Sequence, residues 1–95
     1  MKLYLYVDRD EDYKAVTTEK EIIKKANRFI QEYNKDGEWS EYFIGTDVDG
    51  IDKVKTFNCA IKVLLCMGVY IKKLTVGFGE DATTENLKKY GWMEV

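Results

Sequence analysis

Apolar and bulky side chains alternate along the first residues of the chain. The alternating positions are Leu3, Leu5 and Val7 on one side and Lys2, Tyr4 and Tyr6 on the other. A period of two is typical of a β-strand with one buried face. We therefore predict a strand over residues 2–8, and we expect its leucine and valine side chains to form the buried face.

The next residues predict a hairpin and then a helix. A polar turn over residues 9–13 is followed by a short candidate strand at 14–17, and Thr18 and Glu21 have the spacing of a capping box. A helix over residues 19–35 should follow, because its apolar side chains fall within an arc of about 120°. These side chains are Ile22, Ile23, Ala26, Phe29, Ile30 and Tyr33.

The second half of the chain predicts five further elements. We expect a strand at 38–44, a helix at 50–67, a strand at 69–78, a short helix at 84–90 and an edge strand at 92–95. The apolar face of the longer helix should consist of Ile51, Val54, Phe57, Ile61, Leu64 and Leu65.

This order of elements, β(β)αβαβαβ, predicts a fold of the broad α/β class and, within it, an α+β fold. A small sheet should pack against the two main helices. The length of 95 residues suits one compact domain over residues 1–95, since it is enough for a single core. No internal repeat, linker or low-complexity tract divides the chain.

The net charge and the cysteines restrict which partners and which cellular compartment we expect for this protein. A net charge of −2 argues against general binding to nucleic acids or anionic membranes, because both depend on a basic excess. The two cysteines, Cys59 and Cys66, lie too far apart on one helix to form a disulfide with each other, and we expect buried free thiols. No signal-peptide or membrane-spanning pattern occurs, so we expect a cytoplasmic protein without membrane contact.

The chain contains no histidine. This excludes imidazole as a general base, in Ser/His or Cys/His nucleophile pairs and as a metal ligand. No strong catalytic, metal-binding or nucleotide motif replaces it. We therefore expect a protein that is not an enzyme and that needs no cofactor.

The segment 36–52 carries six carboxylates and no lysine or arginine, and aromatic residues lie among the acids. Rings supply contact area and unpaired carboxylates attract a basic partner, so this composition predicts a docking surface. The expected partner-binding residues are Glu38, Trp39, Glu41, Tyr42, Asp47, Asp49 and Asp52.

The end of this acidic segment allows other interpretations. Its aspartates could hold a hard cation, or two of them could act as an acid and a base. The simpler interpretation is that Asp49 or Gly50 caps the helix expected from residue 50, with the acids near its positive end.

A second acidic pattern suggests a cation-binding protein as an alternative. Asp8, Asp10, Asp12 and Glu19 have the spacing of calcium-loop ligands at positions one, three, five and twelve. Tyr13 stands where such a loop needs glycine, and the preceding residues predict a strand instead of a helix. A solvated hairpin turn is the simpler interpretation, because turns favour aspartate.

A third alternative is a nucleic-acid-associated protein. Residues 53–79 carry five lysines and no acid. These lysines are Lys53, Lys55, Lys62, Lys72 and Lys73. Beside Tyr70 they could contact phosphates while the ring stacks on a base, provided that they converge on one face.

The opening Met1-Lys-Leu-Tyr-Leu-Tyr-Val, with its acidic turn and the Thr18-x-x-Glu21 helix start, resembles small phage and mobile-element proteins of Gram-positive bacteria, including anti-CRISPR proteins. The resemblance covers roughly the first third of the chain and carries over no functional residue. It implies a small non-catalytic inhibitor that offers an acidic surface to a basic, nucleic-acid-binding host protein. This agrees with the acidic aromatic segment, and we adopt it as the leading expectation.

Overall fold

The computed structural model describes residues 2–35, 45–48, 50–74, 85 and 87–94. It contains a four-stranded sheet in the order β3-β1-β2-β4, in which every neighbouring pair is antiparallel. The strands are β1 (Leu3–Asp8), β2 (Tyr13–Thr17), β3 (Val69–Leu74) and β4 (Trp92–Glu94), and the helices are α1 (Glu19–Lys35) and α3 (Phe57–Cys66).

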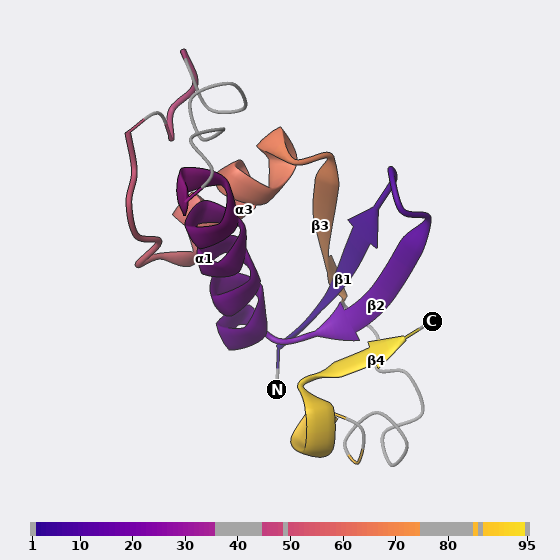
Figure 1. Cartoon of the computed structure of the whole chain (residues 1–95). Coiled ribbons are helices and arrows are strands. Elements are labelled where there is room, and N and C mark those ends of the chain that lie inside the picture. The colour runs from indigo at the N-terminus through magenta and orange to yellow at the C-terminus, as the bar shows by residue number, and fades with distance from the viewer. Residues whose placement is uncertain (1, 36–44, 49, 75–84, 86, 95) are drawn as a thin grey trace.

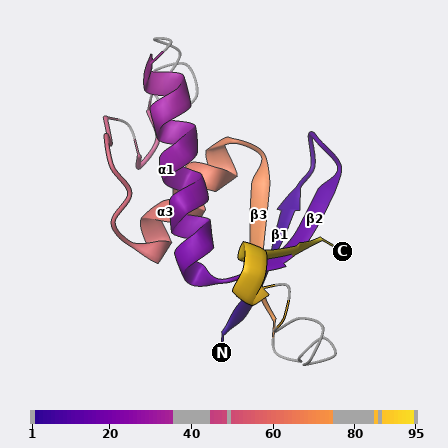
Figure 2. The same cartoon turned by 60° about the horizontal axis from the view of Figure 1, so that its bottom comes forward.

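Both helices lie on the same side of the sheet (Figures 1 and 2). Strand β1 is flanked by β2 and β3, which run parallel to each other, so the chain must cross β1 between them. It does so through α1 and α3. The predicted α+β fold, with a small sheet packed on two main helices, is therefore confirmed. The strand expected at 38–44 lies outside the described residues.

Most element positions agree with the periodicity of the sequence. The hairpin, the first helix and the edge strand are confirmed, and residues 85 and 87–90 are helical where a short helix was expected. Ile22, Ala26 and Ile30 form the buried stripe of α1. Strand β3 is described as far as Leu74.

The buried face of β1 is the opposite of the one predicted. Tyr4 and Tyr6 are 7% and 1% exposed and belong to the core, whereas the leucine and valine face is only half-buried. Tyr4 packs against Phe57 and donates a hydrogen bond from its hydroxyl to Glu19 Oε2, at 3.2 Å. Tyrosine can be buried in this way when its polar end finds a partner.

Helix α3 begins seven residues later than the sequence indicated. Thr56 is its N-cap, with an extended backbone, and its Oγ1 accepts from the amide of Cys59 at 3.2 Å. Val54, expected in the helix, is held instead by Asn27 of α1, which accepts from its N–H at 2.8 Å and donates to its carbonyl at 3.0 Å. These bonds satisfy the backbone of Val54 outside any helix.

The buried residues of α3 also differ from those predicted. Ala60, Val63 and Leu64 face the core, while Leu65, predicted to be buried, is 52% exposed. Nor does Asp49 or Gly50 cap this helix, because Thr56 does.

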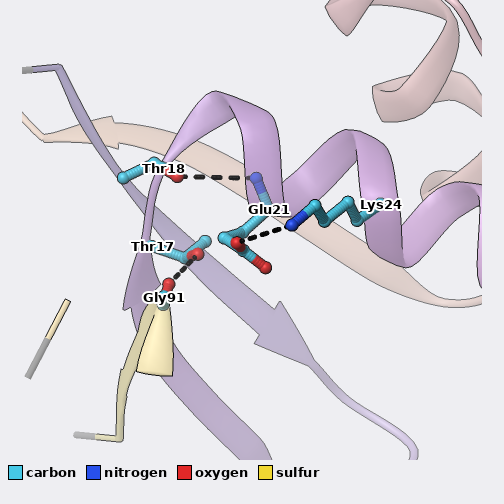
Figure 3. A network of polar contacts seen from close by, with 5 residues as sticks. All are labelled: Thr17, Thr18, Glu21, Lys24 and Gly91. Atoms are coloured by element: carbon cyan, nitrogen blue, oxygen red, sulfur yellow. Dashed lines mark hydrogen bonds and ion pairs between the residues drawn. The ribbon is translucent and has the colours of Figure 1, made fainter. Parts of the chain in front are cut away.

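The C-terminal strand is attached to the start of α1 by a small polar network (Figure 3). Thr17 Oγ1 donates to the carbonyl of Gly91 at 2.7 Å, and Thr18 Oγ1 accepts from the amide of Glu21 at 3.4 Å. Glu21 Oε1 also pairs with Lys24, at 3.5 Å. The predicted helix start at Thr18 is thereby confirmed.

Candidate functional site

The expected docking segment is described only in part. Glu38, Trp39, Glu41, Tyr42 and Asp49 lie outside the described residues, as does Asp36. Asp47 and Asp52 are exposed, on a loop that Val48 anchors in the core. Asp47 Oδ2 lies 3.5 Å from Lys62 Nζ of α3, so one carboxylate of this segment is paired within the chain.

The four candidate calcium ligands do not form a cation site. Asp8 Oδ1 accepts hydrogen bonds from the amides of Asp10 and Glu11, at 3.1 and 3.2 Å, and so closes the β1–β2 turn. Glu19 accepts a hydrogen bond from Tyr4, at the end of the hairpin opposite the turn. Within the described part of the chain, no three His, Cys, Asp or Glu side chains gather closely enough to hold a metal ion.

The turn instead forms one wall of a hollow of about 420 Å³ at the end of α3. We call this the acidic hollow, and its lining residues are Asp8, Asp10, Glu11, Phe29, Leu65, Cys66, Met67 and Gly68. Carboxylates there adjoin apolar side chains, of which Leu65 is exposed and Phe29 and Met67 are half-buried.

Two contacts hold the turn in this position. The amide of Arg9 donates to the carbonyl of Gly68 at 3.4 Å, which links the β1–β2 turn to the turn between α3 and β3. Gly68 has a φ of +79°, and a Cβ there would lie 2.9 Å from Asp10 Oδ2. The aspartate can approach so closely only because residue 68 has no side chain.

The charged residues that line the acidic hollow are all carboxylates. The C-terminal end of a helix carries partial negative charge, and α3 has no basic residue in its last turn. Asp8, Asp10 and Glu11 add three carboxylates at the same end, and none of them forms an ion pair with a described residue. A cationic group placed here would be attracted by both sources of charge.

Arg9, the only cation in this turn, is directed to the other face of the sheet. Its guanidinium carbon lies 4.5 Å from the centre of the Tyr70 ring. There it lines a second hollow of about 190 Å³, which we call the basic hollow. Its lining residues are Leu5, Val7, Arg9, Lys14, Tyr70 and Lys72, and they include no carboxylate.

The structure brings together only part of the predicted lysine patch. Lys72 and Tyr70 share the face opposite the helices, but Lys73 points to the helix side, because neighbouring residues of a strand alternate. Lys53 and Lys55 precede α3, and Lys62 is paired with Asp47. Sequence reasoning did not include Arg9 and Lys14 in the basic patch. The alternation of side chains along the two strands of the hairpin could have placed both beside Val7.

The two thiols are free, as expected, but they are half-buried and not fully buried. Cys66 lines the acidic hollow, while Cys59 lies on α3 away from it. The prediction of two buried cysteines is therefore wrong. The core stripe of α3 is formed by Ala60, Val63 and Leu64, and both cysteines lie beside this stripe.

None of the helices described for this chain has both the length and the apolar character needed to cross a bilayer. Comparison of the chain with protein-family models, with curated proteins and with solved structures finds no match.

Proposed function

We propose that this protein is a cytosolic, non-catalytic protein-binding module that docks on a basic, nucleic-acid-binding host protein. In this proposal it acts as a phage-type inhibitor of the anti-CRISPR kind and competes with nucleic acid for the basic surface. The observation that carries the proposal is the acidic hollow. There three carboxylates, which form no ion pair with a described residue, and the negative end of α3 adjoin Phe29, Leu65 and Met67.

Charge and apolar area have separate roles in this proposal. Carboxylates on one partner speed association with a cationic surface and select against acidic competitors. An exposed leucine beside a half-buried aromatic ring supplies the desolvated contact that holds the complex together. The acidic segment 36–52 extends the same chemistry, and its exposed Asp52 would contribute to steering.

The proposal is tested by capture from host lysate with matched variants. Asp10→Asn with Glu11→Gln removes two charges but leaves Asp8 to close the turn, and Leu65→Ser removes the apolar contact. The fold should survive the charge changes, since they relieve repulsion at a helix C-terminus. Glu85→Gln, at an exposed acid outside the hollow, is the control.

We expect wild type and Glu85→Gln to retain the same basic protein, and the two hollow variants to lose it. Added single-stranded nucleic acid should displace the captured protein. Equal retention by all variants, with their melting temperatures unchanged, would remove the acidic hollow from the proposal.

A second candidate function is supported by the basic hollow. Arg9, Lys14 and Lys72 surround an exposed tyrosine on one sheet face, an arrangement that suits the phosphates and bases of a single strand. Lys14→Gln with Lys72→Gln should then weaken a salt-dependent mobility shift of labelled single-stranded DNA or RNA, while Lys53→Gln should not. If wild type produces no shift at low salt, this second function is excluded.

A further inference from the structure

A third hollow, of about 330 Å³, lies on the helix side of the sheet. We call it the aromatic cleft, and its lining residues are Tyr6, Asp8, Glu11, Tyr13, Lys25, Arg28 and Trp92. The residues come from β1, the β1–β2 turn, β2, α1 and β4, so the cleft exists only in the folded chain. Its volume is within the range of small-molecule sites.

Three rings build the walls of the aromatic cleft. Tyr6 meets Trp92 edge to face, with ring centres 5.2 Å apart and planes at 89°, and it meets Tyr13 at 6.1 Å and 73°. These are preferred aromatic geometries, so the walls are already formed without a ligand. The faces of such rings attract ammonium groups.

The polar end of Tyr6 is a further feature of the aromatic cleft. The residue is 1% exposed, yet its hydroxyl makes no hydrogen bond to any other residue that the structure describes. No fully buried side-chain oxygen in the described part of the chain lacks a partner, so this hydroxyl must lie at the small part of Tyr6 that remains accessible. Tyr6 is one of the residues that line the aromatic cleft.

Tyr6 stays neutral there. Burial raises the pKa of its phenol above the usual value of 10.0, and the nearby charges of Asp8 and Glu11 raise it further. A neutral phenol is both a donor and an acceptor, so it can bond to either end of a charged ligand.

The cleft holds charges of both signs that are not joined to one another. Asp8 and Glu11 belong to the turn, and Lys25 and Arg28 lie three residues apart on α1. Among the described residues no ion pair links the acids to the bases, and Lys25 Nζ rests 5.3 Å from the centre of the Phe29 ring instead. Two anionic and two cationic groups therefore line the same space without forming an ion pair with one another.

We infer that the aromatic cleft binds a small zwitterion, a molecule of amino-acid or dipeptide size that carries one ammonium and one carboxylate. The ammonium contacts Asp8, Glu11 and the ring faces, and the carboxylate contacts Arg28 and Lys25. A purely cationic ligand, such as a basic side chain of the proposed partner, would be repelled by the two bases of α1. This inference is independent of the proposed docking function, although Asp8 and Glu11 border both hollows.

The test is a thermal-shift and calorimetric screen of the purified protein. The probes are the free amino acids and glycine-containing dipeptides, each compared with its N-acetylated and its C-amidated form. A ligand that binds only the folded state raises the melting temperature by mass action. We expect at least one free zwitterion to do so, and we expect blocking either end to weaken its binding at least tenfold.

Variants locate the site and separate it from the docking surface. Arg28→Gln should weaken the zwitterion at least tenfold, and Tyr6→Phe, which keeps the ring, should weaken it several-fold. Lys20→Gln on the exposed side of α1 and Leu65→Ser in the acidic hollow should leave it unchanged. Loss of partner capture in Leu65→Ser with zwitterion binding intact would separate the two proposals.

The inference is overturned if no zwitterion in the screen raises the melting temperature, or if the blocked compounds bind as tightly as the free ones. Unchanged binding in Arg28→Gln would also overturn it. If that variant fails to fold, the comparison of free and blocked compounds on the wild-type protein still tests the inference.

Discussion

Asn27 connects α1 to the segment that precedes α3. Its side chain makes three hydrogen bonds, two with the backbone of Val54 and one, at 3.2 Å, to the carbonyl of Ile23. An amide can both donate and accept, so it can replace the two bonds that Val54 would have made in a helix. A residue on the flank of one helix thereby determines where the next helix can begin.

We predict that Asn27→Ala lowers the free energy of unfolding by about 2 kcal/mol, because it leaves the backbone of the buried Val54 without partners. Asn58→Ala, at an exposed position on α3, is the matched control and should change stability by less than about 0.5 kcal/mol. Urea denaturation measures both. Equal effects of the two substitutions would contradict the assigned role of Asn27.

Tyr6 gives the protein a predicted sensitivity to alkaline pH. Burial raises the phenol pKa of Tyr6, and also those of Tyr4 and Tyr13, above 10.0. In the unfolded chain these phenols ionise near pH 10, whereas the folded protein holds them protonated. Their contribution to stability is therefore fully present below pH 10 and is lost as the pH rises beyond it.

Denaturant melts between pH 8 and 11 test this prediction. The stability of wild type should fall above pH 10, and Tyr6→Phe should make the fall less steep. Tyr90→Phe removes a tyrosine that is 63% exposed and serves as the control. If Tyr6→Phe loses stability with the same pH dependence as wild type, burial of Tyr6 does not account for the effect.

At the scale of elements, Gly91 determines how β4 joins the sheet. It has a φ of +75°, its N–H donates to the carbonyl of Leu87 at 2.9 Å, and its own carbonyl accepts from Thr17 (Figure 3). A Cβ at this position would lie 2.6 Å from Glu21 Cδ. Strand β4, the start of α1 and the end of β2 therefore meet at one glycine.

We predict that Gly91→Ala destabilises the protein by about 2 kcal/mol. Positive φ alone costs a non-glycine residue about 1 kcal/mol, and the new methyl group must also displace Glu21 from Lys24. Gly45→Ala isolates the first effect, because φ there is +74° and nothing lies within 4 Å of an added Cβ. Chemical denaturation should show the larger loss for Gly91→Ala, and equal losses would mean that Glu21 moves aside without cost.

At the scale of the whole molecule, charges of opposite sign line two separate hollows near the β1–β2 turn. Asp8, Asp10 and Glu11 lie on the side of the acidic hollow, while Arg9, Lys14 and Lys72 line the basic hollow. The net charge of −2 hides this separation. A positively or a negatively charged partner would therefore meet a surface of defined charge, although the net charge of the chain is small.

The acidic segment 36–52 should add to the steering of a basic partner. Changing Glu38, Glu41, Asp47 and Asp49 together to their amides should slow association with the basic partner and flatten its dependence on salt, while the melting temperature stays the same. Stopped-flow association at several ionic strengths measures this. An unchanged association rate would assign steering to the turn carboxylates alone.

The sequence alone was sufficient for the elements whose signals are local. The stripe of Ile22, Ala26 and Ile30, the helix start at Thr18 and the alternation of β1 each depend on residues within a few positions of one another. For the same reason it could identify an acidic turn and a lysine-rich stretch. The class of the fold followed from the order of these elements.

Only the tertiary structure decided which faces and surfaces these elements present. Both faces of β1 carry apolar or aromatic side chains, and the tyrosine face is the buried one, where Tyr4 packs against Phe57 of α3 and Tyr6 against Trp92 of β4. The start of α3 depends on a bond between positions 27 and 54. The three hollows likewise combine residues from separate elements, and a local pattern contains no information about which distant side chains will meet.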